Sequence, residues 1–114
     1  MEKWRRLNGQ ILENDIAEEV EYAILKEKSA GHKLKICIGT DSQVKGKFVE
    51  FATVIVFLRE GKGGFMYIYN DRQELRMGLK ERMIKEVAMS IDIAYKIAGL
   101  LDQLDVELEV HADI

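Results

Sequence analysis

The stretch Ile36-Cys37-Ile38-Gly39-Thr40-Asp41-Ser42-Gln43 is an apolar run that ends abruptly in a carboxylate and small polar residues. Such a run is typical of a buried strand, and an ionised carboxylate that leaves water needs a partner. We therefore interpret residues 34–41 as a central strand and Asp41 as a metal ligand at its carboxyl end. The alternative is that Asp41 only caps a turn.

The composition is that of an ordinary globular protein. The chain has 114 residues, of which 47% are hydrophobic and 32% are charged. This length suits a single domain, 1–114, whose core needs no disulfide. The one cysteine, Cys37, lies inside the apolar strand, and we interpret it as a core residue of a reducing compartment.

Charge and hydropathy exclude some classes of protein. The formal net charge of −3 argues against a broadly basic surface that coats nucleic acid. It does not argue against a nuclease whose acidic residues meet phosphate through metal ions. The longest apolar run, Phe51 to Leu58, is far shorter than the roughly 20 residues that cross a membrane. Because no signal peptide is recognisable either, we expect a cytoplasmic protein.

Helical and strand patterns alternate along the chain. Residues 1–33 are expected to form an N-terminal helical segment, with an amphipathic helix over 15–30. The patterns in the sheet and crossover segment, 34–114, predict strands over 34–41, 48–58, 65–69 and 106–113, and a long helix over 72–99.

The connections between these elements predict an α/β fold. Short connections make the first three strands an antiparallel meander, and the long helix returns the fourth strand parallel to the first. The result is a mixed sheet of order 3-2-1-4. The nearly continuous apolarity of the second strand further predicts that both faces of the sheet are covered.

Aspartates end the two parallel neighbours of this sheet, Asp41 and Asp113. Ligands of open α/β sheets bind at the carboxyl ends of such strands. Glu86 borders the buried stripe of the long helix and is the candidate for a third carboxylate, unless it pairs with Arg82 or Lys85. Three ionised carboxylates repel one another unless a hard cation such as Mg²⁺ or Mn²⁺ lies between them. Asp41, Glu86 and Asp113 are therefore the predicted catalytic and metal-binding residues.

Two further groups are candidates for supporting roles. Hydrogen bonds near the metal are expected from Ser42, Gln43 and His111, although these side chains equally suit a turn and a structural histidine. Contacts to the phosphates of nucleic acid are expected from Arg72, Arg76 and Lys80, which recur every four residues at the start of the long helix. A solvated charged face is the alternative for this second group.

These motifs resemble the ribonuclease H-like superfamily. The resemblance rests on Ile38-Gly39-Thr40-Asp41-Ser42-Gln43, on Glu86 in the crossover helix, and on His111-Ala112-Asp113-Ile114. With Gly61-Lys62-Gly63-Gly64 between the next two strands, the pattern is closest to the small, uncharacterised bacterial YkuK-type family. In the superfamily an aspartate ends the first strand, a glutamate lies on the crossover helix and an aspartate ends the fourth strand. The resemblance therefore assigns these roles to Asp41, Glu86 and Asp113.

The resemblance also implies a function. It implies a divalent-metal-dependent nuclease, or a related phosphodiester-processing enzyme, that acts on DNA or RNA. A catalytically silent module that binds nucleic acid or supports an assembly is the alternative. Superfamily members continue past the fourth strand with a further acidic ligand, so we expect the C-terminal part of the fold to be missing from these 114 residues.

Overall fold

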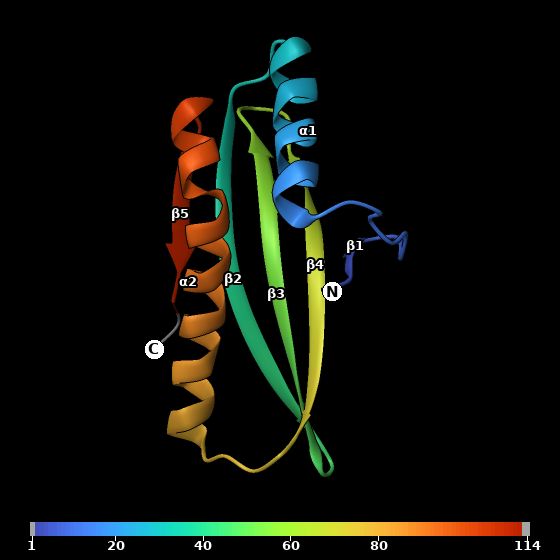
Figure 1. Cartoon of the computed structure of the whole chain (residues 1–114), viewed down its shortest axis with the longest axis vertical. Coiled ribbons are helices and arrows are strands. Elements are labelled where there is room, and N and C mark those ends of the chain that lie inside the picture. The colour runs from blue at the N-terminus through green and yellow to red at the C-terminus, as the bar shows by residue number, and fades with distance from the viewer. Residues whose placement is uncertain (1, 113–114) are drawn as a thin grey trace.

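The computed structural model describes residues 2–112 of the chain. Over these residues the elements are β1 (Trp4–Arg6), α1 (Ile16–Ser29), β2 (Leu34–Lys45), β3 (Phe48–Arg59), β4 (Gly64–Glu74), α2 (Leu79–Gln103) and β5 (Glu107–His111). The strands form one sheet of order β1-β4-β3-β2-β5. Both helices lie over the same face of this sheet (Figure 1). Neither helix has the length and apolarity that a membrane span requires.

The sheet is mixed, as predicted, but its order differs from the predicted one by one added strand: β4, β3, β2 and β5 follow the predicted order 3-2-1-4, and β1 lies at the edge. Strands β2, β3 and β4 are antiparallel neighbours, and β5 returns beside β2 in parallel after the crossover helix α2. Strand β1 pairs with β4 and forms an additional edge strand of the sheet, although we expected residues 1–33 to form only a helical segment. The cause is Trp4, whose side chain is 2% exposed and whose ring lies 5.5 Å from that of Tyr69. Burial of this large aromatic group outweighs a weak local pattern.

The antiparallel strands extend past their predicted ends. Strand β2 continues beyond Asp41 to Lys45, and β4 continues to Glu74. A tight turn at residues 46–47 joins β2 to β3, with Gly46 at a φ of 62° that suits a two-residue hairpin. Because pairing with β3 holds residues 70–74 in the sheet, α2 begins at Leu79 and not at residue 72.

The core lies between the sheet and the two helices. Its buried side chains include Ile16, Val20, Ala23 and Ile24 of α1, Ile93, Ile97 and Leu101 of α2, and Ile36, Ile38, Ile55, Phe57 and Tyr67 of the sheet. Each large apolar side chain contributes roughly 1.5–3 kcal/mol when it is fully buried. On the other face, Ala52, Val54 and Val56 are only half-buried, and no helix within residues 2–112 covers them. Within these residues the predicted cover on both faces is therefore found on one face only.

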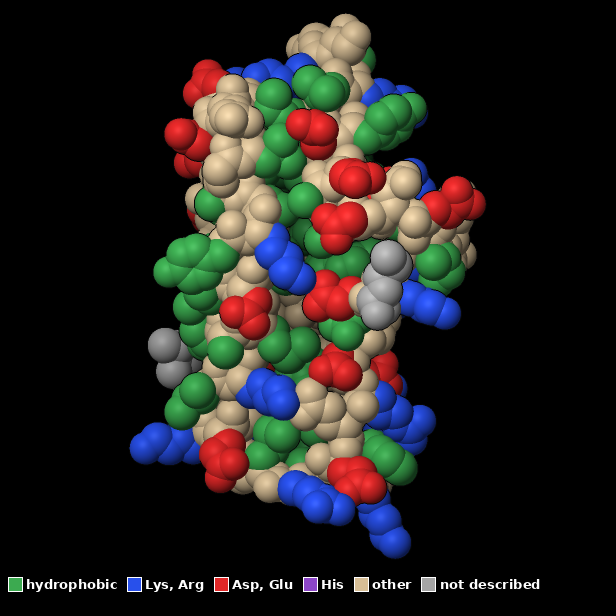
Figure 2. Space-filling model, in the orientation of Figure 1, with side chains coloured by type: hydrophobic (Ala, Val, Ile, Leu, Met, Phe, Trp, Pro, Cys, Tyr) green, Lys and Arg blue, Asp and Glu red, His purple; other side chains and the backbone are tan. Residues whose placement is uncertain are grey.

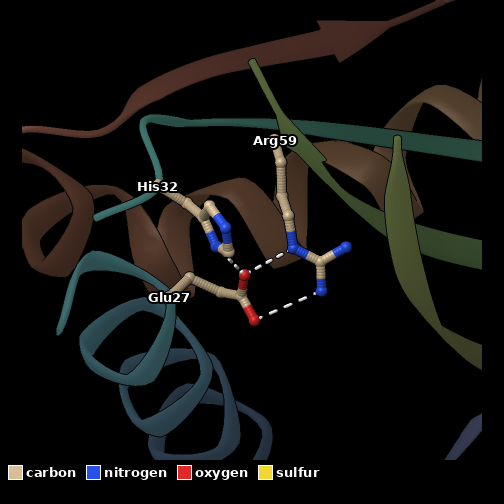
Figure 3. Close-up of polar contacts among 3 residues, drawn as sticks. All are labelled: Glu27, His32 and Arg59. Atoms are coloured by element: carbon tan, nitrogen blue, oxygen red, sulfur yellow. Dashed lines mark hydrogen bonds and ion pairs between the residues drawn. The ribbon is translucent and has the colours of Figure 1, made fainter. Parts of the chain in front are cut away.

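Polar contacts fix both ends of α1. Asp15 is the N-cap, and its Oδ2 accepts a hydrogen bond of 3.2 Å from the amide of Ala17. Near the other end, the Glu27 carboxylate lies between His32 and Arg59 (Figure 3). His32 Nδ1 is 2.8 Å from Glu27 Oε1, and Arg59 Nη2 donates to Oε2 at 3.3 Å. The hydrogen bonds from Arg59, with a smaller contribution from His32, hold the pKa of Glu27 below its ordinary value although burial opposes them.

Candidate metal centre

A buried group of hydroxyls fixes α2 against β2 and β3. Thr40 Oγ1 lies 2.7 Å from Ser90 Oγ and 3.0 Å from Thr53 Oγ1. Ser90 and Thr53 are each 1% exposed, so their hydroxyls depend on these partners. The three hydroxyls therefore set the position of the helix along the strand. Glu86 lies one helical turn before Ser90 and so comes level with the strand residues that follow Thr40.

Ser42 joins two of the candidate acids. Its hydroxyl donates a hydrogen bond to Glu86 Oε2, and its amide donates to Asp41 Oδ1 at 2.9 Å. Consecutive side chains of a strand point to opposite faces of the sheet. Ser42 thus faces α2, whereas Asp41, opposite Ala52 in the ladder, belongs to the uncovered face. The structure brings Asp41 and Glu86 to the same serine, but from different sides of the strand.

The position of Asp41 differs from the predicted one. It lies inside β2 rather than at its end, and a turn cap is excluded because the turn comes only at residues 46–47. What does end near Asp41 is the pairing with β5, whose last partners are Gly39 and His111. In the described chain, Asp41 is therefore the first residue of β2 after the end of the pairing with β5 whose side chain points to the uncovered face of the sheet.

Glu86 has none of the cationic partners that we considered for it. Lys85 Nζ instead donates to Gln73 Oε1 at 2.6 Å and lies 5.7 Å from the centre of the Phe51 ring. Arg82 has a buried Nε without a hydrogen-bond partner in the described chain. The Ser42 hydroxyl is thus the group that holds the Glu86 carboxylate within residues 2–112.

Asp41 borders two open hollows on the uncovered face. One has a volume of about 580 Å³ and is lined by Gly39, Thr40, Asp41, Ala52, Val54, His111 and Ala112. The other, of about 280 Å³, is lined by Asp41, Ser42, Gln43, Glu50 and Ala52. Gln43 and His111, which we considered as neighbours of a metal, therefore flank Asp41 on either side.

The donor chemistry of Asp41 and Glu86 suits a hard divalent cation. Each acid uses one oxygen for Ser42, and the second oxygens, Oδ2 and Oε1, have no hydrogen-bond partner within residues 2–112. Mg²⁺ is commonly held by one or two carboxylates and keeps several of its waters. The third predicted ligand, Asp113, lies outside the described residues.

The three basic candidates do not share a helix face. Arg72 lies in β4 with its guanidinium 4.1 Å from the centre of the Phe48 ring, and Arg76 follows β4 and pairs with Glu74 at 2.6 Å. Of the three, Lys80 alone lies in α2. The predicted start of the helix at residue 72 was wrong because β4 is longer than its sequence pattern indicated, while the phosphate contacts of these residues stay a prediction. Figure 2 shows several Lys and Arg side chains at this end of the molecule, beside the start of α2 and the hairpin turn, with Asp and Glu side chains between them.

A family model described as Ribonuclease H-like matches residues 15–114. The chain belongs to the ribonuclease H-like family. The match spans both helices and every strand except β1, and the mixed sheet with its crossover helix is consistent with this family. Membership fits a nuclease or another function on nucleic acid. Neither the curated proteins nor the solved structures gave a match.

One group of possible metal ligands in this ribonuclease H-like chain was not predicted from the sequence. Cys37, Glu109 and His111 offer ligand atoms that all lie within 4.8 Å of one another. Within residues 2–112 they form the group of three His, Cys, Asp or Glu side chains whose ligand atoms come this close together. Neither Asp41 nor Glu86 belongs to this group. The placement of Glu109 and His111 on one face of the fourth predicted strand was a signal in the sequence. Cys37 could be added to them only once the register between this strand and β2 was known.

Proposed function

We propose that this ribonuclease H-like chain is a divalent-metal-dependent nuclease, or a related phosphodiester-processing enzyme of the YkuK type, that acts on nucleic acid. The proposed ligands of Mg²⁺ or Mn²⁺ are Asp41, Glu86 and Asp113. The observation that carries the proposal is the hydrogen bond from Ser42 to Glu86 in a chain of this family. It brings an acid of the crossover helix to the strand residue directly after Asp41.

The residues around the acids have a positioning role in this proposal. The Ser42 amide orients Asp41 through Oδ1 and leaves Oδ2 free, while the Ser42 hydroxyl does the same for Glu86. The buried hydroxyls of Thr40, Ser90 and Thr53 hold the helix that carries Glu86. When bound, a divalent cation supplies a Lewis acid for the phosphoryl oxygens and lowers the pKa of a bound water.

The Lys and Arg side chains near the hairpin turn and the start of α2 support nucleic acid as the substrate. Lys45 is three residues beyond Ser42, which is about 10 Å along a strand. Lys45 and Arg76 have acidic partners here, Glu50 at 3.4 Å and Glu74 at 2.6 Å. Both are exposed pairs of the kind that contribute little to stability, so a phosphate backbone can replace the acids at small cost.

A second candidate function is a module that binds nucleic acid without cleaving it. The observation that favours it is the placement of Asp41 and Glu86 on different sides of β2. In this arrangement the acids satisfy hydrogen bonds of Ser42 and act as structural side chains. Metal binding separates the two candidates, because a structural role for the acids needs no cation.

The experiment titrates the chain with Mn²⁺ by calorimetry and then measures cleavage of labelled DNA, RNA and hybrid duplexes in Mn²⁺ or Mg²⁺. The acid variants are Asp41→Asn, Glu86→Gln and Asp113→Asn. Their matched controls are Asp92→Asn and Glu81→Gln, which remove the same charges from exposed positions of α2. The nuclease proposal requires that the acid variants lower Mn²⁺ affinity and cleavage by about tenfold or more, with no loss in the controls. Nucleic-acid binding without Mn²⁺ binding at millimolar concentration would identify the silent module instead.

A further inference from the structure

A thiol, a carboxylate and an imidazole meet on the uncovered face of the sheet. Cys37 of β2 and Glu109 of β5 are direct partners in the parallel register, and His111 follows Glu109 by two residues. Because side chains of a strand alternate between faces, all three point to the same side, away from the helices. Their ligand atoms lie within 4.8 Å of one another, and His111 Nε2 is 3.1 Å from Glu109 Oε1.

The chemical types of these donors select a cation. Thiolate and imidazole are ligands that Zn²⁺ prefers, whereas Mg²⁺ and Mn²⁺ favour oxygen. Zn²⁺ bonds of about 2.0–2.3 Å in a tetrahedron place neighbouring ligand atoms roughly 3.3–3.8 Å apart. The three ligand atoms here lie within 4.8 Å of one another, so side-chain adjustments of roughly 1 Å bring them to the spacing that a zinc ion requires.

We propose that Cys37, Glu109 and His111 bind one Zn²⁺ ion, with the fourth position open to solvent. The site is accessible, since the side chains of Glu109 and His111 are 40% and 62% exposed, while Cys37 forms its buried base. Lys35 pairs with Glu109 Oε2 and thereby leaves Oε1 turned to His111. The ion takes the place of the hydrogen bond between Glu109 and His111.

The consequence of the site is a link by metal coordination between the central strand and the edge strand. Strand β5 has five residues and pairs only with β2 among the described strands. A bound Zn²⁺ connects the two strands across the register pair Cys37–Glu109 and at His111, so it stabilises the docking of β5. This site uses none of the acids of the proposed nuclease centre, although His111 is also a candidate neighbour of that centre, and the inference does not require the chain to be a nuclease.

Cobalt provides a direct test, because the chain has a single cysteine and two histidines. The reduced, metal-free full chain is titrated with Co²⁺, and the thiolate-to-cobalt charge-transfer band is followed in the near ultraviolet. We expect a band that saturates at one ion per chain and disappears when Zn²⁺ is added. Excess Zn²⁺ should also raise the Tm by roughly 4 °C or more.

Variants distinguish this site from the other histidine and from folding effects. Cys37→Ser should abolish the band, and His111→Gln and Glu109→Gln should each weaken Co²⁺ binding by about tenfold or more. His32→Gln, which changes the other histidine, should leave the band unchanged. Since Glu109 and His111 are exposed, their variants test the site even if Cys37→Ser does not fold. A folded wild-type chain without the band, or a band that survives in His111→Gln and Glu109→Gln, would overturn the proposal.

Discussion

The Ser42 hydroxyl donates a hydrogen bond to the Glu86 carboxylate, and this contact links two residues that lie 44 positions apart in the chain. Ser42 is also the residue whose amide binds the Asp41 carboxylate. One serine therefore orients an acid of the central strand and an acid of the crossover helix. Any function that needs both acids depends on this residue.

Ser42→Ala tests this dependence. The substitution removes a hydrogen bond to a carboxylate, so we expect a loss of roughly 1 kcal/mol in the free energy of unfolding. It also frees Glu86 to reorient, and Mn²⁺ affinity should fall if Glu86 is a ligand. Urea unfolding and calorimetry measure the two effects. Ser29→Ala, at an exposed position of α1, is the control and should change neither quantity. Equal behaviour of the two variants would mean that the contact has no energetic role.

The glycine that begins β4 is expected to resist substitution. A Cβ at Gly64 would lie 2.2 Å from the Phe57 carbonyl oxygen, which belongs to the backbone of a central strand and cannot move freely. We expect Gly64→Ala to lower the free energy of unfolding by about 2 kcal/mol or more.

Gly99 provides the matched comparison. It is exposed in α2, and apart from its chain neighbours and the nearby backbone of its own helix, no described atom lies within 4 Å of a Cβ placed there. Because glycine costs a helix interior conformational entropy, Gly99→Ala should raise stability by roughly 0.5–1 kcal/mol. Chemical denaturation measures the free energy of unfolding of both variants. Destabilisation by Gly99→Ala would show that the space beside Gly99 is occupied.

The Glu27 carboxylate should make stability depend on pH. Arg59 and then His32 lower its pKa below the ordinary value of 4.5, so the folded state favours the ionised form. The resulting stabilisation is fully present above the unfolded pKa and is lost as the pH falls through the lower, folded pKa. Glu27→Gln should therefore cost about 1 kcal/mol at neutral pH and converge with the wild type in acid.

Unfolding curves from neutral pH to about pH 3 measure this difference. Glu21→Gln, an exposed position of the same helix, serves as the control for the change of charge. A constant difference between Glu27→Gln and wild type at every pH would contradict the role assigned to the ion pair.

Trp4 offers an optical test of the added edge strand. It is the one tryptophan of the chain, and its side chain is 2% exposed beside Tyr69. The native fluorescence should therefore be blue-shifted and move to the red on unfolding. Trp4→Phe should be milder than Trp4→Ala, for which a loss of about 3 kcal/mol or more is expected. A native spectrum typical of solvated tryptophan would mean that β1 is not docked.

Local patterns were sufficient to predict the class of fold. Alternation over the fourth predicted strand, helical spacing over residues 72–99 and a capping aspartate at Asp15 are properties of neighbouring residues. The structure confirms that the elements they indicated exist, although the long helix begins at Leu79. Short connections and one crossover then predicted a mixed sheet with a parallel pair. The family match is consistent with the resemblance that the motifs of Asp41 and Glu86 suggested.

Tertiary structure decided which side chains meet. The burial of Trp4 against Tyr69 created β1, and pairing with β3 drew Arg72 into β4, because both effects come from residues distant in sequence. The ladder also set the side of the sheet to which each residue points. The sequence alone placed Asp41 among possible ligands, but the strand register put it on the face of His111 and left Ser42 to meet Glu86. Register is fixed by the packing of the whole sheet, and no single stretch of sequence contains it.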